Sequence, residues 1–261
     1  MNMNVDAFIL ARLDSSRLPR KHLLHIENKP IIQHLVERIS KCKTIRKIIV
    51  CTTENTTDDS LINFLEKEKI LWFRGSEHDV IKRLLDAATA YETDIIVDIE
   101  GDKLYTEPEF VDKSVDEMIN SNYDFVMGSL SSNSVDHSDH SIPAVFPAVI
   151  KKSALEKVYS MKNEKNTETG YRQYFTSNPI FQCRYVTLPH LKIPKNLRLT
   201  IDYEQDIKLA QIIFKNLGNS FTFKDVLKFI QNNPDVLKIT DVLNEEWTKN
   251  YNQKFLNHDK H

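Results

Sequence analysis

Short apolar runs alternate with longer amphipathic stretches over the first half of the chain. The runs that have the length of buried strands lie at 5–11, 47–53, 70–75, 94–102 and 123–129. Between them, apolar residues recur every three or four positions, as in helices that bury one face, at 30–42, 56–69, 79–91 and 107–121. Strands and helices in this alternation predict an α/β fold of βαβ units, with a parallel sheet whose faces are covered by helices.

Local signals mark the start of two of these helices. Pro30 suits a first helical turn, because its φ angle is already fixed and the turn does not need its N–H group. Thr56 or Thr57 is expected to cap the helix at 56–69, whose first turn is acidic and therefore complements the positive end of the helix.

The pattern changes after about residue 130. A polar, turn-rich segment is followed by mixed polar and aromatic stretches, so we predict that 130–195 forms an insertion or edge extension and a candidate dimerisation arm. Residues 197–218 predict a strand, an acidic turn and an amphipathic helix. The expected organisation is one domain over 1–222 that contains the insertion, followed by a charged helical tail at 223–261.

Composition and charge narrow the class of protein. With 261 residues, of which 41% are hydrophobic, the chain can bury the core of one large domain. A net charge of −2 argues against a general nucleic-acid or membrane binder, so any anion site must be local. The three cysteines form no CxxC pair, and no apolar run has the length of a signal peptide core or a membrane span. We therefore expect a cytoplasmic protein with reduced thiols.

Positive charge gathers directly after the first predicted strand. The stretch ARLDSSRLPRK contains one acid, Asp14, and four cations: Arg12, Arg17, Arg20 and Lys21. A loop that leaves a parallel strand lies at the sheet edge where ligands bind, and its N–H groups and cations can hold a polyphosphate. Because Asp14 cannot pair with every cation, we expect several to lack a counterion until an anion binds. The chain contains neither GxxxxGK[ST] nor GxGxxG, which excludes the ordinary P-loop and dinucleotide motifs.

Two acidic motifs also follow predicted strands. Asp102 comes directly after Gly101 at the end of one strand, and Asp202 follows another strand late in the chain. Mg²⁺ in proteins commonly binds one or two carboxylates together with phosphate oxygens, so these two residues are candidate ligands. For Asp206, one turn further on, we favour a simple role at the positive end of a helix.

The motif FRGSEHDV joins a predicted strand to a predicted helix. Backbone groups of the turn formed by Arg74, Gly75 and Ser76 could hold a base or ribose, and Asp79 stands where the helix begins. The alternative interpretation is that the motif only caps the helix. The sequence leaves both interpretations open.

Together these stretches resemble a known family. ARLDSSRLPRKHLLHIENKPIIQHLVERI, IIVCTTENTTDD, FRGSEHDVIKR, IEGD and LTIDYEQD occur in an order and at spacings similar to the cytidylyltransferase superfamily of 3-deoxy-manno-octulosonate and acylneuraminate activating enzymes. Within it, the sequence is most similar to the branch named after the spore coat polysaccharide biosynthesis protein SpsF. The similarity covers roughly the first 125 residues and the stretch 197–215.

The resemblance implies a Rossmann-like nucleotidyltransferase fold, with a doubly wound, mostly parallel sheet and an inserted dimerisation arm. It implies transfer of CMP from CTP to an acidic sugar or related acceptor, with release of pyrophosphate, for surface polysaccharide synthesis. Mg²⁺ is the implied cofactor and a homodimer the implied assembly.

Site residues follow from the resemblance in the same way. The implied catalytic residues are Arg12, Arg17 and Lys21, and the implied Mg²⁺ ligands are Asp102 and Asp202. The residues implied to contact the nucleotide are Ala11, Arg12, Ser15, Ser16, Arg17, Lys21, Arg74, Gly75, Ser76, Asp79 and Glu100.

The acceptor side departs from the family pattern. Asp98 and Glu100 replace the Arg and Thr usual in the branch, and Lys103 replaces a small residue. Candidate cations for an acidic acceptor are Lys103, Arg172 and Arg184. The acceptor therefore stays open. Alternatives are a phosphonate or phospho-alcohol acceptor, a catalytically silent nucleotide-binding relative, and a glycosyltransferase, against which the basic loop argues.

Overall fold

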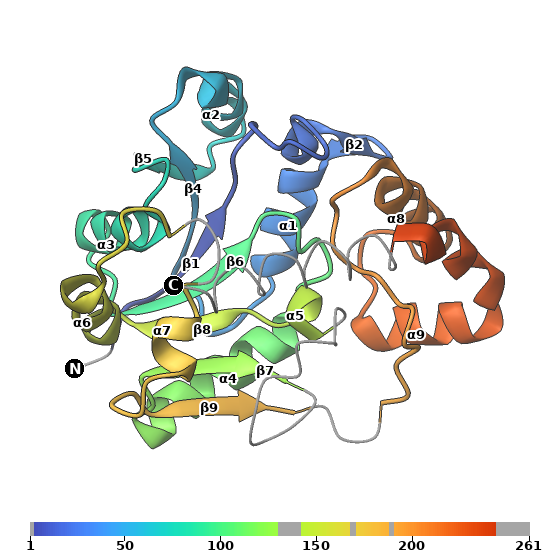
Figure 1. Ribbon diagram of the computed structural model, residues 1–261. Helices are drawn as coiled ribbons and strands as arrows, with labels where there is room; N and C mark the ends of the chain where they lie inside the picture. The colour runs from blue at the N-terminus through green and yellow to red at the C-terminus, as the bar shows by residue number, and fades with distance from the viewer. Residues whose placement is uncertain (1–2, 130–141, 168–170, 188–190, 244–261) are drawn as a thin grey trace.

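A seven-stranded sheet forms the centre of the computed structural model, which describes residues 3–129, 142–167, 171–187 and 191–243 (Figure 1). The strands are β1 (Val5–Leu10), β4 (Lys47–Thr53), β5 (Leu71–Gly75), β6 (Ile95–Glu100), β7 (Phe125–Gly128), β8 (Ala148–Lys151) and β9 (Cys183–Val186). Their order is β5-β4-β1-β6-β8-β7-β9, and neighbours are parallel except for β8, which is antiparallel to both β6 and β7. The predicted mostly parallel sheet is confirmed.

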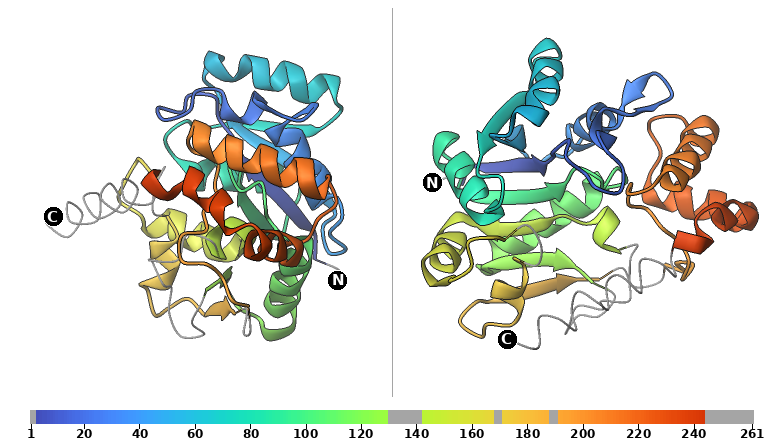
Figure 2. Two further views of the ribbon diagram at one scale, coloured as in Figure 1. Left: turned by 90° about the vertical axis from the view of Figure 1, so that its right-hand side faces the viewer. Right: turned by 45° about the horizontal axis from the view of Figure 1, so that its top comes forward.

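Helices cover both faces of this sheet. They are α1 (Ile31–Ile39), α2 (Asp59–Lys67), α3 (Val80–Ala90), α4 (Pro108–Ser121), α5 (Ile142–Val145), α6 (Lys152–Met161), α7 (Gln173–Thr176), α8 (Glu204–Leu217) and α9 (Phe223–Asn232). One hydrophobic cluster contains side chains of α1, α2, α4, α8 and α9, and a second contains those of α3, α6 and α7. The left view of Figure 2 faces α8 and α9, which lie side by side.

Strand β1 shows how the two clusters share the sheet. Ala7 and Ile9 belong to the first cluster and Phe8 to the second, and all three side chains are fully buried. Successive side chains of a strand point to opposite faces, so a strand covered on both sides has apolar side chains on both faces. The unbroken apolar run at 7–11 therefore has a direct structural reason, while the buried Asp6 at the start of β1 is paired with Arg46 and accepts the hydroxyl of Thr93.

Smaller elements complete the fold. A two-stranded sheet consists of β2 (His25–Ile26) and β3 (Lys29–Pro30), and short 3-10 helices lie at Lys21–Leu23, Thr56–Asp58 and Pro234–Ile239. Within the described residues, no helix is both long enough and apolar enough to cross a membrane.

The cap predicted for the helix at 56–69 is wrong in detail. Asn55, rather than Thr56 or Thr57, provides the side-chain cap: its Oδ1 accepts a hydrogen bond of 3.0 Å from the backbone N–H of Thr57. Thr56 to Asp58 form a 3-10 turn, and α2 begins only at Asp59. Asn is at least as favourable as Thr as the residue that caps the free N–H groups at the start of a helix, which is why Asn55 can take this role.

The strand predicted at the start of 197–218 is also wrong. Leu197, Leu199 and Ile201 are buried in the alternation typical of a strand, but this segment pairs with no strand of the sheet. The segment lies near the end of β6, but β6 is already paired with β1 on one side and β8 on the other, and the two edge strands of the sheet are β5 and β9. The segment instead contacts the turn after β6, where Ile201 N donates a hydrogen bond of 3.1 Å to Asp102 O.

The segment 130–195 contributes to the sheet itself. Its strand β8 lies between β6 and β7, and its strand β9 forms the edge beside β7. Residues 130–141, 168–170 and 188–190 fall outside the described part of the chain. Use of this segment as a dimerisation arm, and the homodimer itself, stay predictions.

A buried ion pair joins the C-terminal helices to the sheet domain. Arg38 of α1 donates to Glu107 Oε2 at 2.9 Å and to the carbonyl oxygen of Thr106 at 2.8 Å. It also donates to the carbonyl oxygen of Phe221 at 2.9 Å. Glu107 Oε2 accepts the N–H of Phe223 at the start of α9. The boundary expected near residue 222 is thus crossed by hydrogen bonds and by a common core.

We expect Arg38→Met to lower the free energy of unfolding by about 3–5 kcal/mol in urea denaturation, because it leaves Glu107 buried without its cation. Lys29→Met is the matched control. It breaks the pair that Lys29 of β3 makes with Glu37 of α1, whose side chains are 35% and 41% exposed, and should cost less than about 1 kcal/mol. Equal losses in the two variants would contradict this assignment.

Candidate active site

The basic loop and the Gly101–Asp102 turn lie beside each other at one edge of the sheet. Leu10 at the end of β1 pairs with Glu100 at the end of β6, and Gly101 N donates to Leu10 O at 2.8 Å. Parallel strands bring their carboxyl ends to the same edge, which is where such sheets bind ligands. The chain thus brings two motifs that are about ninety residues apart in sequence into contact.

The basic loop is held firmly at its base. Leu13 and Leu18 are buried in the first hydrophobic cluster. Asp58, which is fully buried, accepts the N–H of Leu13 at 2.7 Å through Oδ1 and the hydroxyl of Thr53 at 2.6 Å through Oδ2. Arg20 N donates to Leu13 O at 3.0 Å and closes the loop. The loop therefore has a defined shape before any ligand binds.

One ammonium group joins the two predicted metal ligands. Lys21 Nζ lies 2.8 Å from Asp102 Oδ2 and 3.0 Å from Asp202 Oδ1. Arg17 Nη2 adds a contact of 2.7 Å to the same oxygen of Asp202. The predicted convergence of the loop cations with two aspartates distant in sequence is present in the structure.

This arrangement corrects the expectation that the loop cations lack counterions. Arg17 and Lys21 are neutralised by carboxylates that lie 81 to 185 positions away, so Asp14 is not needed as their partner. Burial lowers the pKa of Lys21, but Asp102 and Asp202 outweigh it and the net pKa lies above the usual value. The ammonium group is therefore charged throughout the neutral range.

Asp202 is fixed from its other side by a second network. Arg198 Nη2 contacts Asp202 Oδ2 at 3.2 Å, and Arg198 Nε contacts Asp206 Oδ1 at 2.8 Å. Asp206 Oδ2 accepts the N–H groups of Asp202 and Tyr203 at 2.8 and 2.9 Å. The guanidinium carbons of Arg17 and Arg198 lie over the ring of Tyr203, 5.7 and 5.5 Å from its centre. Asp206 thus both caps α8 and holds Arg198.

Gly101 allows the close approach that places Asp102. A Cβ at Gly101 would lie 2.8 Å from both Leu10 O and His22 Cε1, so no larger residue fits without moving the backbone. The His22 ring is buried beneath this turn, and its Nδ1 has no hydrogen-bond partner among the described residues. Burial, together with the charge of Lys21, lowers the pKa of His22 to about 4. The imidazole ring is therefore neutral near pH 7 and packs against the Gly101 turn as an uncharged aromatic group.

The residues that depart from the family pattern form one cluster. Glu100 contacts Lys103 Nζ at 3.1 Å and Arg172 Nη2 at 2.9 Å. Asp98 accepts a hydrogen bond from the hydroxyl of Tyr171, and its Oδ2 lies 3.8 Å from Arg172. Burial raises the pKa of Asp98 and lowers that of Lys103. Burial also opposes ionisation of Glu100, but the two cations outweigh it and lower its pKa.

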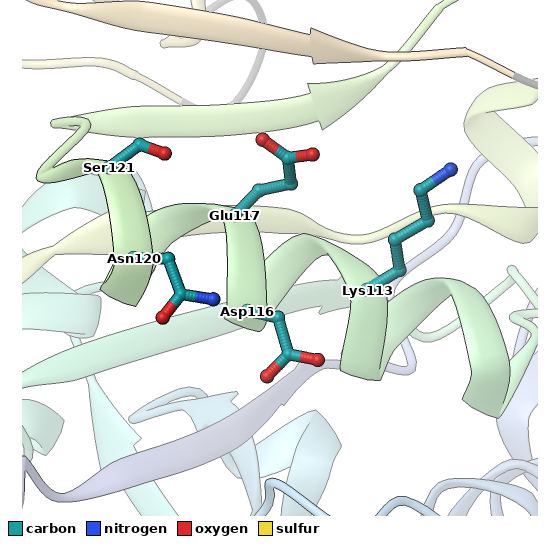
Figure 3. A pocket seen from close by; sticks show the side chains of 5 residues that line it. All are labelled: Lys113, Asp116, Glu117, Asn120 and Ser121. Carbon is teal, nitrogen blue, oxygen red and sulfur yellow. The ribbon is translucent and has the colours of Figure 1, made fainter.

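Arg184, the third predicted acceptor cation, does not join this cluster. It lies on β9 and its Nε is 3.4 Å from Glu117 Oε2 of α4. Glu117 lines a hollow of about 200 Å³. Figure 3 shows the side chains that line it, all of which come from α4. The C-terminal half of α4 leads into the start of β7, at the amino ends of the parallel strands, whereas the basic loop lies at their carboxyl ends.

The turn after β5 acts as a structural cap, which was one of the two open interpretations. Ser76 Oγ accepts the N–H of Asp79 at 3.1 Å, and Asp79 Oδ1 accepts that of Lys82 at 3.0 Å at the start of α3. Asp79 Oδ2 also contacts Lys162 Nζ at 2.6 Å. The Arg74 side chain holds the loop after β4, through the carbonyl oxygen of Thr53 and two further partners.

The remaining predicted nucleotide contacts lie on the loop itself. Ala11 is buried, and its N–H donates to Cys51 O at 3.2 Å. Ser15 Oγ accepts the N–H of Leu18 at 3.3 Å, which shapes the turn, whereas Ser16 is exposed. Arg12 is half-buried, close enough to the buried Arg83 of α3 to contribute to the lowered pKa of that guanidinium.

Residues 7–239 match the family described as cytidylyltransferase. This chain belongs to that family. It is 30% identical to an uncharacterized protein of Methanocaldococcus jannaschii over 239 residues, which cover 91% of this chain and 94% of that protein. It is 23% identical to the spore coat polysaccharide biosynthesis protein SpsF of Bacillus subtilis, over 89% of this chain and 97% of SpsF. The resemblance stated from the sequence is confirmed.

Two further comparisons agree with this assignment. The 3-deoxy-manno-octulosonate cytidylyltransferase of Geobacter sulfurreducens is 27% identical over 68% of this chain and 64% of its own length. The solved structure of a cytidylyltransferase from Leptospira borgpetersenii superposes with a TM-score of 0.78 at 27% identity, over 90% of this chain and 97% of the other. The Rossmann-like nucleotidyltransferase fold is therefore also confirmed.

Some functional residues of this cytidylyltransferase were not identified from sequence. Arg198, Asp58 and His22 all support the site. Asp58 and His22 lie within stretches that resemble the family but were not singled out as site residues, and Arg198 lies just before such a stretch. For Arg198 a signal was present. It is the one cation in the alternating apolar stretch LRLTI, four positions before Asp202 and eight before Asp206, and a buried cation requires nearby carboxylates.

The donor atoms of this cytidylyltransferase suit a hard divalent cation. Asp102 Oδ1 is buried and has no hydrogen-bond partner in the described structure, and Asp202 supplies a second carboxylate across Lys21 Nζ. No group of three or more His, Cys, Asp or Glu ligands occurs in the parts of the chain that the structure describes. Two carboxylates fit Mg²⁺, which takes its other ligands from substrate phosphates and water, and do not fit a structural Zn²⁺ site.

The buried neutral His22 predicts a loss of stability in acid. In the unfolded chain the imidazole takes up a proton near pH 6.5, but in the folded protein only near pH 4. The free energy of unfolding should therefore fall as the pH is lowered from about 6.5 to about 4, by on the order of 2 kcal/mol. The variant His22→Phe keeps an aromatic ring there and should lose this part of the pH dependence in thermal melting. An unchanged dependence in that variant would contradict the assignment.

Proposed function

We propose that this cytidylyltransferase transfers CMP from CTP to an acidic sugar acceptor with Mg²⁺ as cofactor, releasing pyrophosphate. The observation that supports this most directly is the contact of Lys21 with both Asp102 and Asp202 at the carboxyl edge of the sheet. It brings phosphate-binding cations and two oxygen ligands for a metal to one point. Phosphoryl-type transfer needs such alignment and charge neutralisation more than covalent catalysis.

The loop after β1 would bind the nucleotide. Arg12, Arg17 and Lys21 would bind the triphosphate, and the last two would stabilise the negative charge that develops on the leaving pyrophosphate. The side chain of Arg17 is 46% exposed, so its guanidinium can turn from Asp202 to a phosphate without leaving the protein surface.

Asp102 and Asp202 would hold the metal ion. When bound there, Mg²⁺ would neutralise the negative charge of the phosphate oxygens and lower the pKa of an acceptor hydroxyl. The protein's own part is to keep the two carboxylates in place, through the Gly101 turn on one side and Arg198 on the other.

The cluster of Glu100, Lys103 and Arg172 would bind the acceptor. Arg172 contacts Glu100 at the end of β6, and its side chain is 22% exposed, so it would bind a carboxylate of the acceptor. Lys103 is buried behind Glu100 and would add positive charge to this end of the site. The names of two relatives, which refer to a polysaccharide and to 3-deoxy-manno-octulosonate, support an acidic sugar as the acceptor class.

The proposal is tested by measuring pyrophosphate release from CTP across a panel of acidic sugars. Lys21→Ala and Asp102→Asn should each reduce kcat/KM by about 10²–10³, because each removes a charge that acts on the transferring phosphoryl group. Arg20→Ala is the control, since Arg20 is exposed and its guanidinium donates to Ser60 Oγ at 3.0 Å, outside the site. Release that is unaffected in Lys21→Ala, or no CTP-dependent release with any acceptor, would refute the proposal.

The acceptor assignment has its own test. Arg172→Ala should raise the KM for an acidic acceptor by about 10–100-fold with little change in the KM for CTP, because a charge-assisted hydrogen bond to the acceptor is lost. Arg184→Ala removes the same charge on β9, where its partner is Glu117, and should leave both constants unchanged. A larger effect at Arg184 than at Arg172 would reverse the assignment.

A further inference from the structure

The ammonium group of Lys21 occupies the space between the two proposed metal ligands. It contacts Asp102 Oδ2 at 2.8 Å and Asp202 Oδ1 at 3.0 Å. Arg17 shares Asp202 Oδ1, and Arg198 takes Asp202 Oδ2. Three of the four carboxylate oxygens therefore already have cationic partners in the free protein, and only Asp102 Oδ1 has no hydrogen bond.

A divalent cation cannot simply be added to this arrangement. The side chains of Lys21 and Asp202 are only 9% and 6% exposed, so water screens the charges poorly. An ion bound by the same oxygens would lie within a few ångströms of a fixed positive charge. Together with Asp206, which shares Arg198, the two carboxylates are also already balanced by Lys21, Arg17 and Arg198, so a metal alone would give the site an excess of positive charge.

A polyphosphate changes this balance. Its oxygens offer Lys21 and Arg17 new partners, and the departure of these cations frees Asp102 Oδ2 and Asp202 Oδ1 for a metal. We propose that Lys21 excludes divalent metal ions from the Asp102–Asp202 pair until a nucleotide triphosphate binds, so that metal and nucleotide enter the site together. This inference rests on the proposed function in taking the two aspartates as the metal ligands and the loop cations as the ligands of the triphosphate.

The test measures metal binding in the absence of nucleotide. Mn²⁺ is the probe, because its free and bound forms are distinguished by electron paramagnetic resonance. The wild-type protein should bind no Mn²⁺ at the site, whereas Lys21→Met should bind it about tenfold more tightly or better, since it removes the competing charge from buried carboxylates. A gain of metal binding on deletion of a site residue is not expected from structural damage.

Matched variants locate the effect. Arg20→Met removes one positive charge from the neighbouring position of the same loop and should leave Mn²⁺ binding unchanged. Lys21→Arg keeps the charge and should also bind no Mn²⁺. Adding Asp102→Asn to Lys21→Met should abolish the new binding, which shows that the ion is held by the aspartate pair.

The proposal is overturned if wild type and Lys21→Met bind Mn²⁺ equally, whether both bind it or neither does. Lys21→Met leaves two buried carboxylates side by side and can be unstable, so its melting temperature is measured with and without Mn²⁺. Mn²⁺ should raise the melting temperature of this variant and not that of the wild type. Absence of that difference counts equally against the proposal. Neither readout involves CTP turnover, so a failure here is distinct from a failure of the proposed function.

Discussion

The site depends on the balance of charge around Asp202. This carboxylate is almost fully buried and receives contacts from Arg17, Lys21 and Arg198, which come from two segments far apart in the chain. A buried carboxylate is tolerated only when cations and hydrogen bonds surround it, so the basic loop and the segment before α8 stabilise each other. The second carboxylate, Asp102, joins the same network through Lys21. Binding chemistry and local stability therefore rest on the same few contacts.

Local patterns were sufficient to predict the sheet and the edge at which the site lies. The apolar runs of β1, β4, β5, β6 and β7 and the helices between them carry strong periodic signals. Parallel strands then require the loop after β1 and the turn after β6 to meet, so the neighbourhood of Lys21 and Asp102 followed from topology. Asp202 was a candidate metal ligand from its position after a predicted strand, and the family resemblance implied the same role.

Other features required information that local sequence does not contain. The alternation at Leu197, Leu199 and Ile201 matches a strand, but whether a strand forms depends on a free neighbour in the sheet, and β1 and β8 already flank β6. The counterions of Arg17 and Lys21 likewise come from residues up to 185 positions away. No periodicity of the chain encodes such pairs. The order of sheet strands and the partners of buried charges are consequences of the complete fold.

The reversed strand β8 determines how the acceptor cluster is attached. It starts beside Asp98 and ends beside Ile95, so α6 must carry the chain back to the carboxyl edge. There Asp79 anchors Lys162, and the chain beyond it brings Arg172 to Glu100. The segment that carries Arg172 is thus held by ion pairs at both ends, by Lys162 on Asp79 and by Arg172 on Glu100. Its other side chains can change during evolution while the hydrogen bonds of the sheet and of the basic loop stay unaltered.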